Sequence, residues 1–221
     1  MRLFIAIPFT DEVKANLMDC IYNLKKQSLG GQFTNPAYLS LSLAYITEYQ
    51  KEEDIQDAMD TVSVEPFEIF LRGYGISNRR SGNIHYSSCE PHPQLTELHK
   101  QLVDALAAKG ISVNEDDFDL QFTLARNMQP IRTFNPGAFS HTVPRQHMKV
   151  TEIALIKSDY DAEKRLVYTE LYRKALPVPE PTEEEKQEAA KAQVQAEAEA
   201  AKEKSEGKKS GGLFGLFKKR K

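Results

Sequence analysis

Apolar positions in the first part of the chain alternate between the spacing of strands and the spacing of helices. The run from Leu3 to Ile7 predicts a short, buried strand. Helical spacing follows from Val13 to Leu24, behind a potential cap at Thr10, and the glycine pair 30–31 ends it. Alternation of polar and apolar residues over 38–46 then predicts a half-buried strand. The chain therefore opens as strand, helix and strand.

The middle of the chain continues with helices and a hairpin. Apolar residues at helical spacing predict a second helix over residues 55–62. Residues 67–75 and 83–88 form a predicted pair of strands around a polar turn. Pro93 begins a third amphipathic helix, and Gly110 ends it.

One more strand and a final hairpin complete the predicted elements. The strand covers residues 118–125, and the hairpin joins residues 150–156 to residues 166–172. Strands and helices are partly segregated along the chain instead of alternating regularly. This order favours an α+β fold over a doubly wound parallel sheet.

Composition and charge divide the chain into three parts. The 221 residues have a formal net charge of -3, but residues 1–176 carry 19 basic and 23 acidic side chains. Residues 177–206 form a Pro-bounded stretch rich in Glu, Ala and Lys, without an apolar face. Residues 207–221 carry six basic side chains and no acid. We predict a globular domain over 1–176, a solvated spacer with helical propensity over 177–206, and a flexible apolar and basic tail over 207–221.

Several classes of protein are disfavoured by simple counts. No apolar run approaches the ~20 residues of a membrane-spanning helix, and the first ten residues are a poor secretory signal. Cys20 and Cys89 provide neither a disulfide framework nor a zinc set, which favours a reducing, cytoplasmic setting. None of the five histidines has metal-ligand spacing with another ligand, so we expect no metal and no cofactor.

Two predicted strands contain a weak internal repeat. Residues 38–41 (YLSL) and 121–124 (QFTL) share the order polar, apolar, hydroxyl, leucine. Alternation places the first and third residue of each segment on one face of its strand. Two such strands that face each other would line a cleft with hydroxyls and larger polar groups. Two ordinary strands with solvent-facing sides would show the same alternation.

The segment 1–176 resembles the 2H phosphoesterase superfamily, and within it the RNA 2′,3′-cyclic phosphodiesterases once described as bacterial 2′-5′ RNA ligases. The likeness includes MRLFIAI at the start, FEIFLRGYG after Pro66, FTLAR ending at Arg126, and the hairpin LIKSDYDAEKRLVYTEL. It implies a bilobal fold of two pseudo-symmetric lobes, each an antiparallel sheet with helices outside, around a central cleft. In this family one histidine per lobe, followed two residues later by Ser or Thr, hydrolyses a cyclic phosphate without a metal.

The resemblance places substitutions at both histidines of that motif. Tyr38 stands at the first position and Gln121 at the second, whereas Ser40 and Thr123 keep the hydroxyls. Arg126 keeps a cation able to meet phosphate. An amide exchanges no proton, and a tyrosine with a pKa near ~10 is a poor base at neutral pH. The resemblance thus implies a catalytically impaired member, a pseudoenzyme that binds an RNA end or a phosphate-bearing nucleotide.

An active enzyme with altered acid and base groups is the first alternative. It would hydrolyse a 2′,3′-cyclic phosphate to a 2′-phosphate through Tyr38 or His85, whose strand face can reach a cleft; a surface or structural histidine is the competing interpretation. Arg79 and Arg80 lie in a polar turn that we expect to be solvated and free of RNA, since the body is acidic and lacks a basic stripe.

The second alternative is an interaction protein that works through its C-terminal tail. LFGLF over residues 213–217 precedes four basic residues. Such a terminus suits an anionic membrane surface, where each basic residue adds about 1 kcal/mol. It equally suits a groove on a protein partner, or it is an ordinary soluble end. We expect a monomer in the cytoplasm, with peripheral membrane association as the further option.

Overall fold

The computed structural model describes residues 2–46, 51–80, 82–113 and 118–178. The predicted tail over 207–221, and all but the first two residues of the predicted spacer, lie outside this part. In chain order the elements are β1 (Arg2–Pro8), α1 (Asp11–Lys26), β2 (Ser28–Phe33), the 3-10 helix η1 (Pro36–Tyr38), β3 (Ser40–Ile46), α2 (Glu52–Asp60), β4 (Phe67–Arg79), β5 (Gly82–Cys89), α3 (Pro93–Ala108), β6 (Gln121–Pro130), α4 (Pro136–Ser140), β7 (Gln146–Val150), β8 (Glu152–Tyr160) and β9 (Leu166–Ala175).

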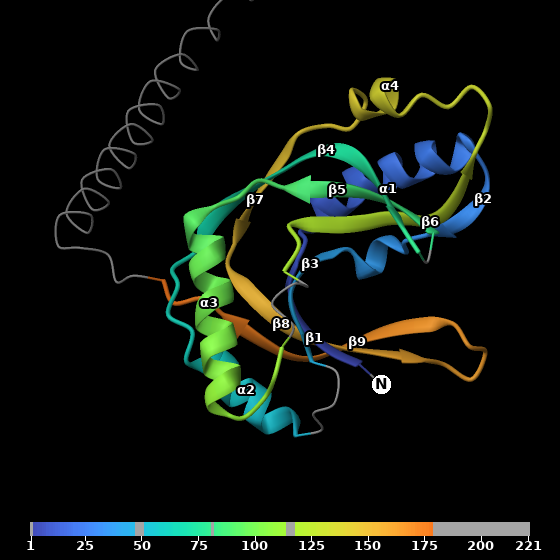
Figure 1. Ribbon diagram of the computed structural model, residues 1–221. Coiled ribbons are helices and arrows are strands. Elements are labelled where there is room, and N and C mark those ends of the chain that lie inside the picture. The colour runs from blue at the N-terminus through green and yellow to red at the C-terminus, as the bar shows by residue number, and fades with distance from the viewer. Residues whose placement is uncertain (1, 47–50, 81, 114–117, 179–221) are drawn as a thin grey trace, which may run out of the picture. The chain divides into compact units, whose positions relative to one another are not determined.

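Two separate sheets organise the described chain (Figure 1). The first has the strand order β3-β1-β8-β9, and the second has the order β2-β6-β5-β4-β7. Every strand pair that the structure describes is antiparallel. The predicted α+β class with two antiparallel lobes is therefore confirmed.

Two of the helices, α1 and α3, pack against the sheet that does not contain the strand preceding them. Helix α1 follows β1 of the first sheet but packs against β2 and β7 of the second. Helices α2 and α3 pack together, and they contact β9 and β3 of the first sheet (Figure 1). Because each lobe takes elements from both halves of the chain, one apolar core runs through both. None of the helices in the described residues is long and apolar enough to cross a membrane.

The start of α1 and both ends of α3 follow the chemistry expected from the sequence, whereas α1 ends at Lys26, before the glycine pair 30–31, which lies in β2. Thr10 caps α1, and its Oγ1 accepts from the backbone N–H of Val13 at 3.4 Å. Pro93 stands at the start of α3. After this helix Gly110 adopts a positive φ of 73° and donates to the carbonyl of Ala107. These caps fix where the chain turns from one sheet toward the other.

Four elements went unpredicted: β2, η1, α4 and β7. Strand β2 contains two glycines and no alternation, so its pairing with β6 supplies what its own pattern lacks. A Cβ at Gly31 would lie 2.9 Å from Met128 Cα, which explains a glycine at this close approach. Strand β7 has only five residues, is an edge strand, and follows the short helix α4. His147 lies on β7.

Candidate functional site

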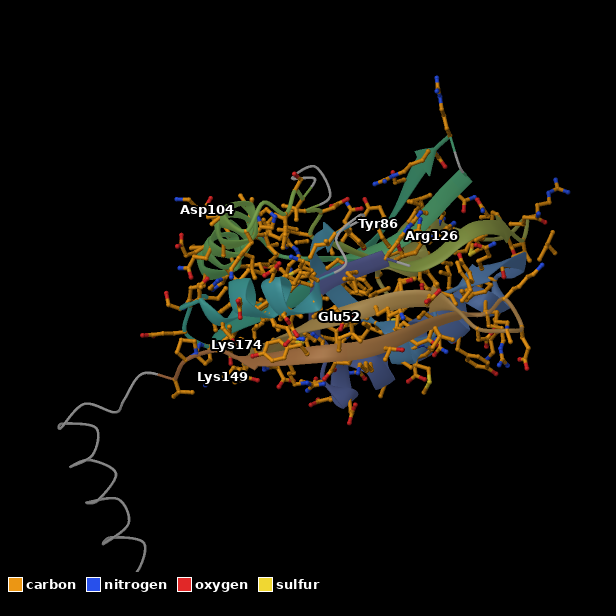
Figure 2. All side chains as sticks on the ribbon, turned by 90° about the horizontal axis from the view of Figure 1, so that it is seen from below. Glu52, Tyr86, Asp104, Arg126, Lys149 and Lys174 are labelled. Atoms are coloured by element: carbon orange, nitrogen blue, oxygen red, sulfur yellow. The ribbon has the colours of Figure 1, made fainter. Side chains whose placement is uncertain are left out.

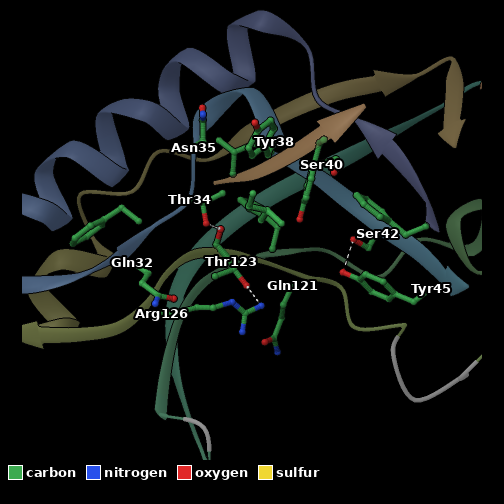
Figure 3. Close-up of a pocket in the computed structure, with 16 residues that line it drawn as sticks. Gln32, Thr34, Asn35, Tyr38, Ser40, Ser42, Tyr45, Gln121, Thr123 and Arg126 are labelled. Atoms are coloured by element: carbon green, nitrogen blue, oxygen red, sulfur yellow. Dashed lines mark hydrogen bonds between the residues drawn. The ribbon is translucent and has the colours of Figure 1, made fainter. Parts of the chain in front are cut away.

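A cleft of about 360 Å³ opens between the two sheets, at the facing strands β3 and β6 (Figure 3). All five residues predicted to line a cleft do line it: Tyr38, Ser40, Gln121, Thr123 and Arg126. The remaining lining residues of the described chain are Phe4, Gln32, Phe33, Thr34, Asn35, Leu39, Ser42, Tyr45, Phe122, Leu166 and Tyr168.

Strands β3 and β6 have the same shape where they face the cleft. Their first six residues share one order of burial: half-buried, buried, half-buried, buried, buried, exposed. Each strand also carries a bulge at the same point. Leu43 is the extra residue in β3, and Leu124 is the extra residue in β6. The equivalent segments are therefore residues 40–45 (SLSLAY) and residues 121–126 (QFTLAR).

Matching hydrogen bonds follow the bulges. In β3 the Tyr45 hydroxyl donates to Ser42 Oγ at 2.8 Å. In β6 Arg126 Nη2 donates to Thr123 Oγ1 at 3.3 Å. Each strand thus presents a hydroxyl that accepts from the side chain three residues later. Figure 3 shows the two hydrogen-bonded pairs on opposite sides of the cleft.

This equivalence corrects the predicted pairing of the two segments. Tyr38 was expected to match Gln121, but Tyr38 lies in the 3-10 helix η1 before the strand begins. The counterpart of Gln121 is Ser40, and the counterpart of Thr123 is Ser42. The sequence Leu-Ser-Leu-Ser-Leu over 39–43 repeats every two residues. Alternation therefore allows either residues 38 and 40 or residues 40 and 42 to be the counterparts of Gln121 and Thr123. The position of the bulge decides between these two alignments, and the alternation of polar and apolar residues does not reveal where the bulge lies.

Hydrogen bonds to β6 bring Tyr38 to the cleft without placing it in a strand. Thr34 donates from its backbone N–H to Leu124 O at 2.9 Å and from its hydroxyl to Thr123 O at 2.8 Å. Asn35 then caps η1, and its Oδ1 accepts from the backbone N–H of Ala37 at 3.0 Å. The 3-10 turn thus places the Tyr38 side chain in the lining of the cleft.

Aromatic rings form one wall of the cleft. The rings of Tyr38 and Tyr168 lie 4.5 Å apart at an angle of 30°. Tyr168 also meets Phe4 edge-on at 5.2 Å, and Phe4 contacts Tyr45 at 5.6 Å. Burial raises the pKa of Tyr168, Tyr45 raises it further, and Arg126 opposes the shift. Tyr168 is thus a neutral hydrogen-bonding group at physiological pH.

All but one of the described side chains that line the cleft are uncharged. Arg126 is the only charged side chain among the described residues around the cleft, and His, Asp, Glu, Lys and Cys are absent from that set. Across the described chain, no group of three or more His, Cys, Asp or Glu side chains is placed to hold a metal ion. Cys20 and Cys89 are free, buried thiols, and burial raises the pKa of Cys89 to about 12.

His85 does not reach this cleft. It is only 2% exposed, and its Nδ1 makes a short hydrogen bond with the Tyr74 hydroxyl. The rings of Tyr74 and Phe134 lie against it. Its neighbours on the strand, Ile84 and Tyr86, line the cleft side of the second sheet, so His85 points to the opposite face. The predicted role of His85 as an alternative acid or base is corrected to that of a buried structural residue.

Comparison with known proteins gives a consistent result. A family model described as the 2′-5′ RNA ligase superfamily matches residues 27–162. The curated RNA 2′,3′-cyclic phosphodiesterase of Thermotoga maritima is 26% identical over 132 residues, which are 57% of this chain and 70% of that protein.

Solved structures of two other bacterial proteins share the fold. A protein of Thermus thermophilus has a TM-score of 0.64 at 24% identity, with 81% of this chain and 100% of that chain covered. LigT of E. coli, complexed with 3′-AMP, has a TM-score of 0.63 at 24% identity, with 79% and 97% covered. The bilobal architecture expected from the sequence is that of these structures.

Proposed function

The chain belongs to the 2′-5′ RNA ligase superfamily, and we propose that it is a catalytically impaired relative of the RNA 2′,3′-cyclic phosphodiesterases. In this proposal the cleft binds a phosphate-bearing nucleotide or an RNA end without hydrolysing it efficiently. The observation that carries the proposal is the lining itself: its described residues combine one arginine with hydroxyl and amide groups, and they include no group that titrates near neutral pH.

The arrangement around Arg126 suits a phosphate. A guanidinium group supplies several donors in a fixed fork, and charge-assisted hydrogen bonds to phosphate are stronger than neutral ones. Thr123 and Ser42 offer hydroxyls from the two facing strands. The similar protein LigT has been solved in complexes with phosphate and with ATP as well as with 3′-AMP. Its ligands support a nucleotide phosphate as the class to test first.

The positions equivalent to the family histidines support the loss of hydrolysis. The resemblance puts Gln121 at the second family histidine, and the shared bulges pair Gln121 with Ser40. Neither side chain exchanges protons near neutral pH. One positioned acid or base contributes a factor of about 10²–10⁴ in rate, so losing both leaves little turnover. Tyr38 keeps a phenol nearby, but its hydroxyl is a poor base at neutral pH.

Calorimetry with adenosine 2′-monophosphate, together with an assay of 2′,3′-cyclic AMP hydrolysis, tests the proposal. We expect measurable binding and no turnover above that of a Ser40→Ala, Gln121→Ala double variant. Arg126→Gln should weaken binding at least about tenfold, because it removes charge-assisted hydrogen bonds. Arg132→Gln is the matched control, since Arg132 is exposed in the turn after β6.

The two parts of the proposal fail separately. If the wild-type protein hydrolyses the cyclic nucleotide and the double variant does not, the impairment is wrong. If adenosine 2′-monophosphate does not bind, or if Arg126→Gln and Arg132→Gln bind it equally well, the binding role of the cleft is wrong.

A further inference from the structure

The cleft continues beyond Arg126 into a second cavity of about 400 Å³. The two cavities share Ser42, Tyr45, Gln121, Thr123 and Arg126 as lining residues, so they form one continuous groove. The additional wall of the second cavity consists of Arg2, Arg79, Ile84, Tyr86 and Asp119. A single phosphate group beside Arg126 would leave this second cavity unused.

The second cavity is basic within an acidic body. Its described lining contains three arginines and one carboxylate, Asp119. Residues 1–176, by contrast, carry four more acidic than basic side chains. Such a concentration of positive charge in a groove attracts anions and raises their local concentration.

Two of these arginines are available to a ligand. Arg2 is exposed, and its side chain has no hydrogen bond or ion pair within the part of the chain that the structure describes. Arg79 Nη2 lies 3.9 Å from Asp119 Oδ2, with side chains 59% and 43% exposed. A long, exposed ion pair of this kind contributes little stability, so Arg79 can turn to a stronger partner.

The structure distinguishes Arg79 from its neighbour in the hairpin turn. Both were predicted to be solvated, but Arg79 lines the cavity and Arg80 does not. Aromatic side chains lie beside this basic group. Tyr86 and Arg126, labelled in Figure 2, line the same cavity from neighbouring strands. A Cβ at Gly75 would lie 2.5 Å from the Tyr86 ring. A glycine at this position of β4 therefore allows the Tyr86 ring to pack against the strand.

We propose that Arg2 and Arg79 form a second phosphate subsite, and that the ligand is a single-stranded oligoribonucleotide end of at least two nucleotides. This inference rests on the proposed function and adds a length requirement to it. The terminal phosphate binds beside Arg126 and Thr123, and the neighbouring phosphodiester binds between Arg2 and Arg79. Tyr45 and Tyr86 offer ring surface to the neighbouring nucleoside, as aromatic groups do for single strands.

Calorimetry with two probes tests this subsite. The probes are adenosine 3′-monophosphate and the dinucleotide ApAp, which adds one phosphodiester and one nucleoside. We expect wild-type protein to bind ApAp at least about tenfold more tightly, as extra charge-assisted hydrogen bonds allow. An Arg2→Ala, Arg79→Ala double variant should lose most of that preference and keep its affinity for the mononucleotide. Arg80→Ala, the matched control, should keep the preference.

Salt dependence gives a second measurement with the same proteins. The plot of log affinity for ApAp against log salt should be steeper than the plot for the mononucleotide by about 0.7 per additional phosphate neutralised. The double variant should lose this extra slope. Both arginines are exposed, so a loss of folding is not expected and circular dichroism checks it.

The outcomes separate this inference from the proposed function. If wild-type protein binds both probes equally, or if the Arg80→Ala variant loses the preference as fully as the double variant does, the second subsite is wrong while the proposed function stands. If the double variant loses affinity for the mononucleotide as well, the two arginines are part of the first site and the inference is again wrong. If neither probe binds wild-type protein but adenosine 2′-monophosphate does, the subsite is wrong while the proposed function stands. If none of the three ligands binds, both fail.

Discussion

Strands β3 and β6 face each other across the cleft with the same backbone and different chemistry. Both carry the bulge, the order of burial and the internal hydrogen bond three residues apart. Yet β3 ends its segment with the phenol of Tyr45, and β6 ends it with the guanidinium of Arg126. Buried leucines and bulges fix the shape, whereas the exposed positions set the charge. One strand can therefore hold an anion while its counterpart supplies neutral donors.

Replacing the two equivalent cleft residues by histidine should produce the largest effect. We expect a Ser40→His, Gln121→His double variant to hydrolyse 2′,3′-cyclic AMP at least about 10²-fold faster than wild type, because it introduces an acid and a base. A bell-shaped dependence of kcat/KM on pH would identify the pair.

A second double variant tests whether Ser40 or Tyr38 is the counterpart of Gln121. Tyr38→His with Gln121→His places the first histidine in η1, before the strand begins. If this variant gains more activity than the Ser40 variant, then Tyr38 is the counterpart of Gln121 and the equivalence based on the bulges is wrong. If neither variant gains activity, other groups required for hydrolysis are missing from the cleft.

The buried faces of the two strands should respond alike. Leu43 and Leu124, the extra residues at the two bulges, are 1% and 0% exposed and belong to one core. Leu43→Ala and Leu124→Ala should each lower the free energy of unfolding by about 2–5 kcal/mol through lost burial and a residual cavity. Urea unfolding followed by circular dichroism measures this. A single transition in both variants supports one shared core, and two transitions would show that the lobes unfold independently.

Most elements of the fold could be predicted from the sequence because their patterns are local. Helix α1 has its cap at Thr10, and helix α3 has Pro93 at its start and Gly110 after its end. Strand β2 could not be predicted in this way. Its residues carry no alternation, and its place in the sheet depends on pairing with β6, a strand far later in the chain.

The cleft itself was predictable only in part. Hydroxyl and polar positions on two strands indicated Ser40, Gln121 and Thr123, and the resemblance added Arg126. Ser42 and Tyr45 were missed because the repeat Leu-Ser-Leu-Ser-Leu fits two frames equally well. Tyr168 comes from the final hairpin, and no local pattern brings it to Tyr38. Contacts between distant segments decide these positions.

A buried titratable side chain lies on the face of the second sheet that is turned away from the cleft, and it predicts the smallest effect. His85 lies on β5, beside β6, and burial lowers the pKa of its imidazole below the usual value. Its neutral form therefore stabilises the fold above the unfolded pKa of about 6.5, and this contribution decreases as pH falls below that value. We expect the free energy of unfolding to fall by up to about 1.4 kcal/mol per pH unit in this window.

A His85→Gln variant isolates this contribution from the other titrating groups. Urea unfolding of wild type and variant at about pH 7 and about pH 5.5, on either side of the unfolded pKa, measures the difference. The variant should be less stable at neutral pH, since the Tyr74 hydroxyl loses its buried histidine partner, and it should lose less stability than wild type on acidification. Hydrogen exchange at the acidic pH should then show loosening first in β5 and β6 of wild type. Equal acid sensitivity in the two proteins would contradict this assignment and leave the two sheets alike in their response to pH.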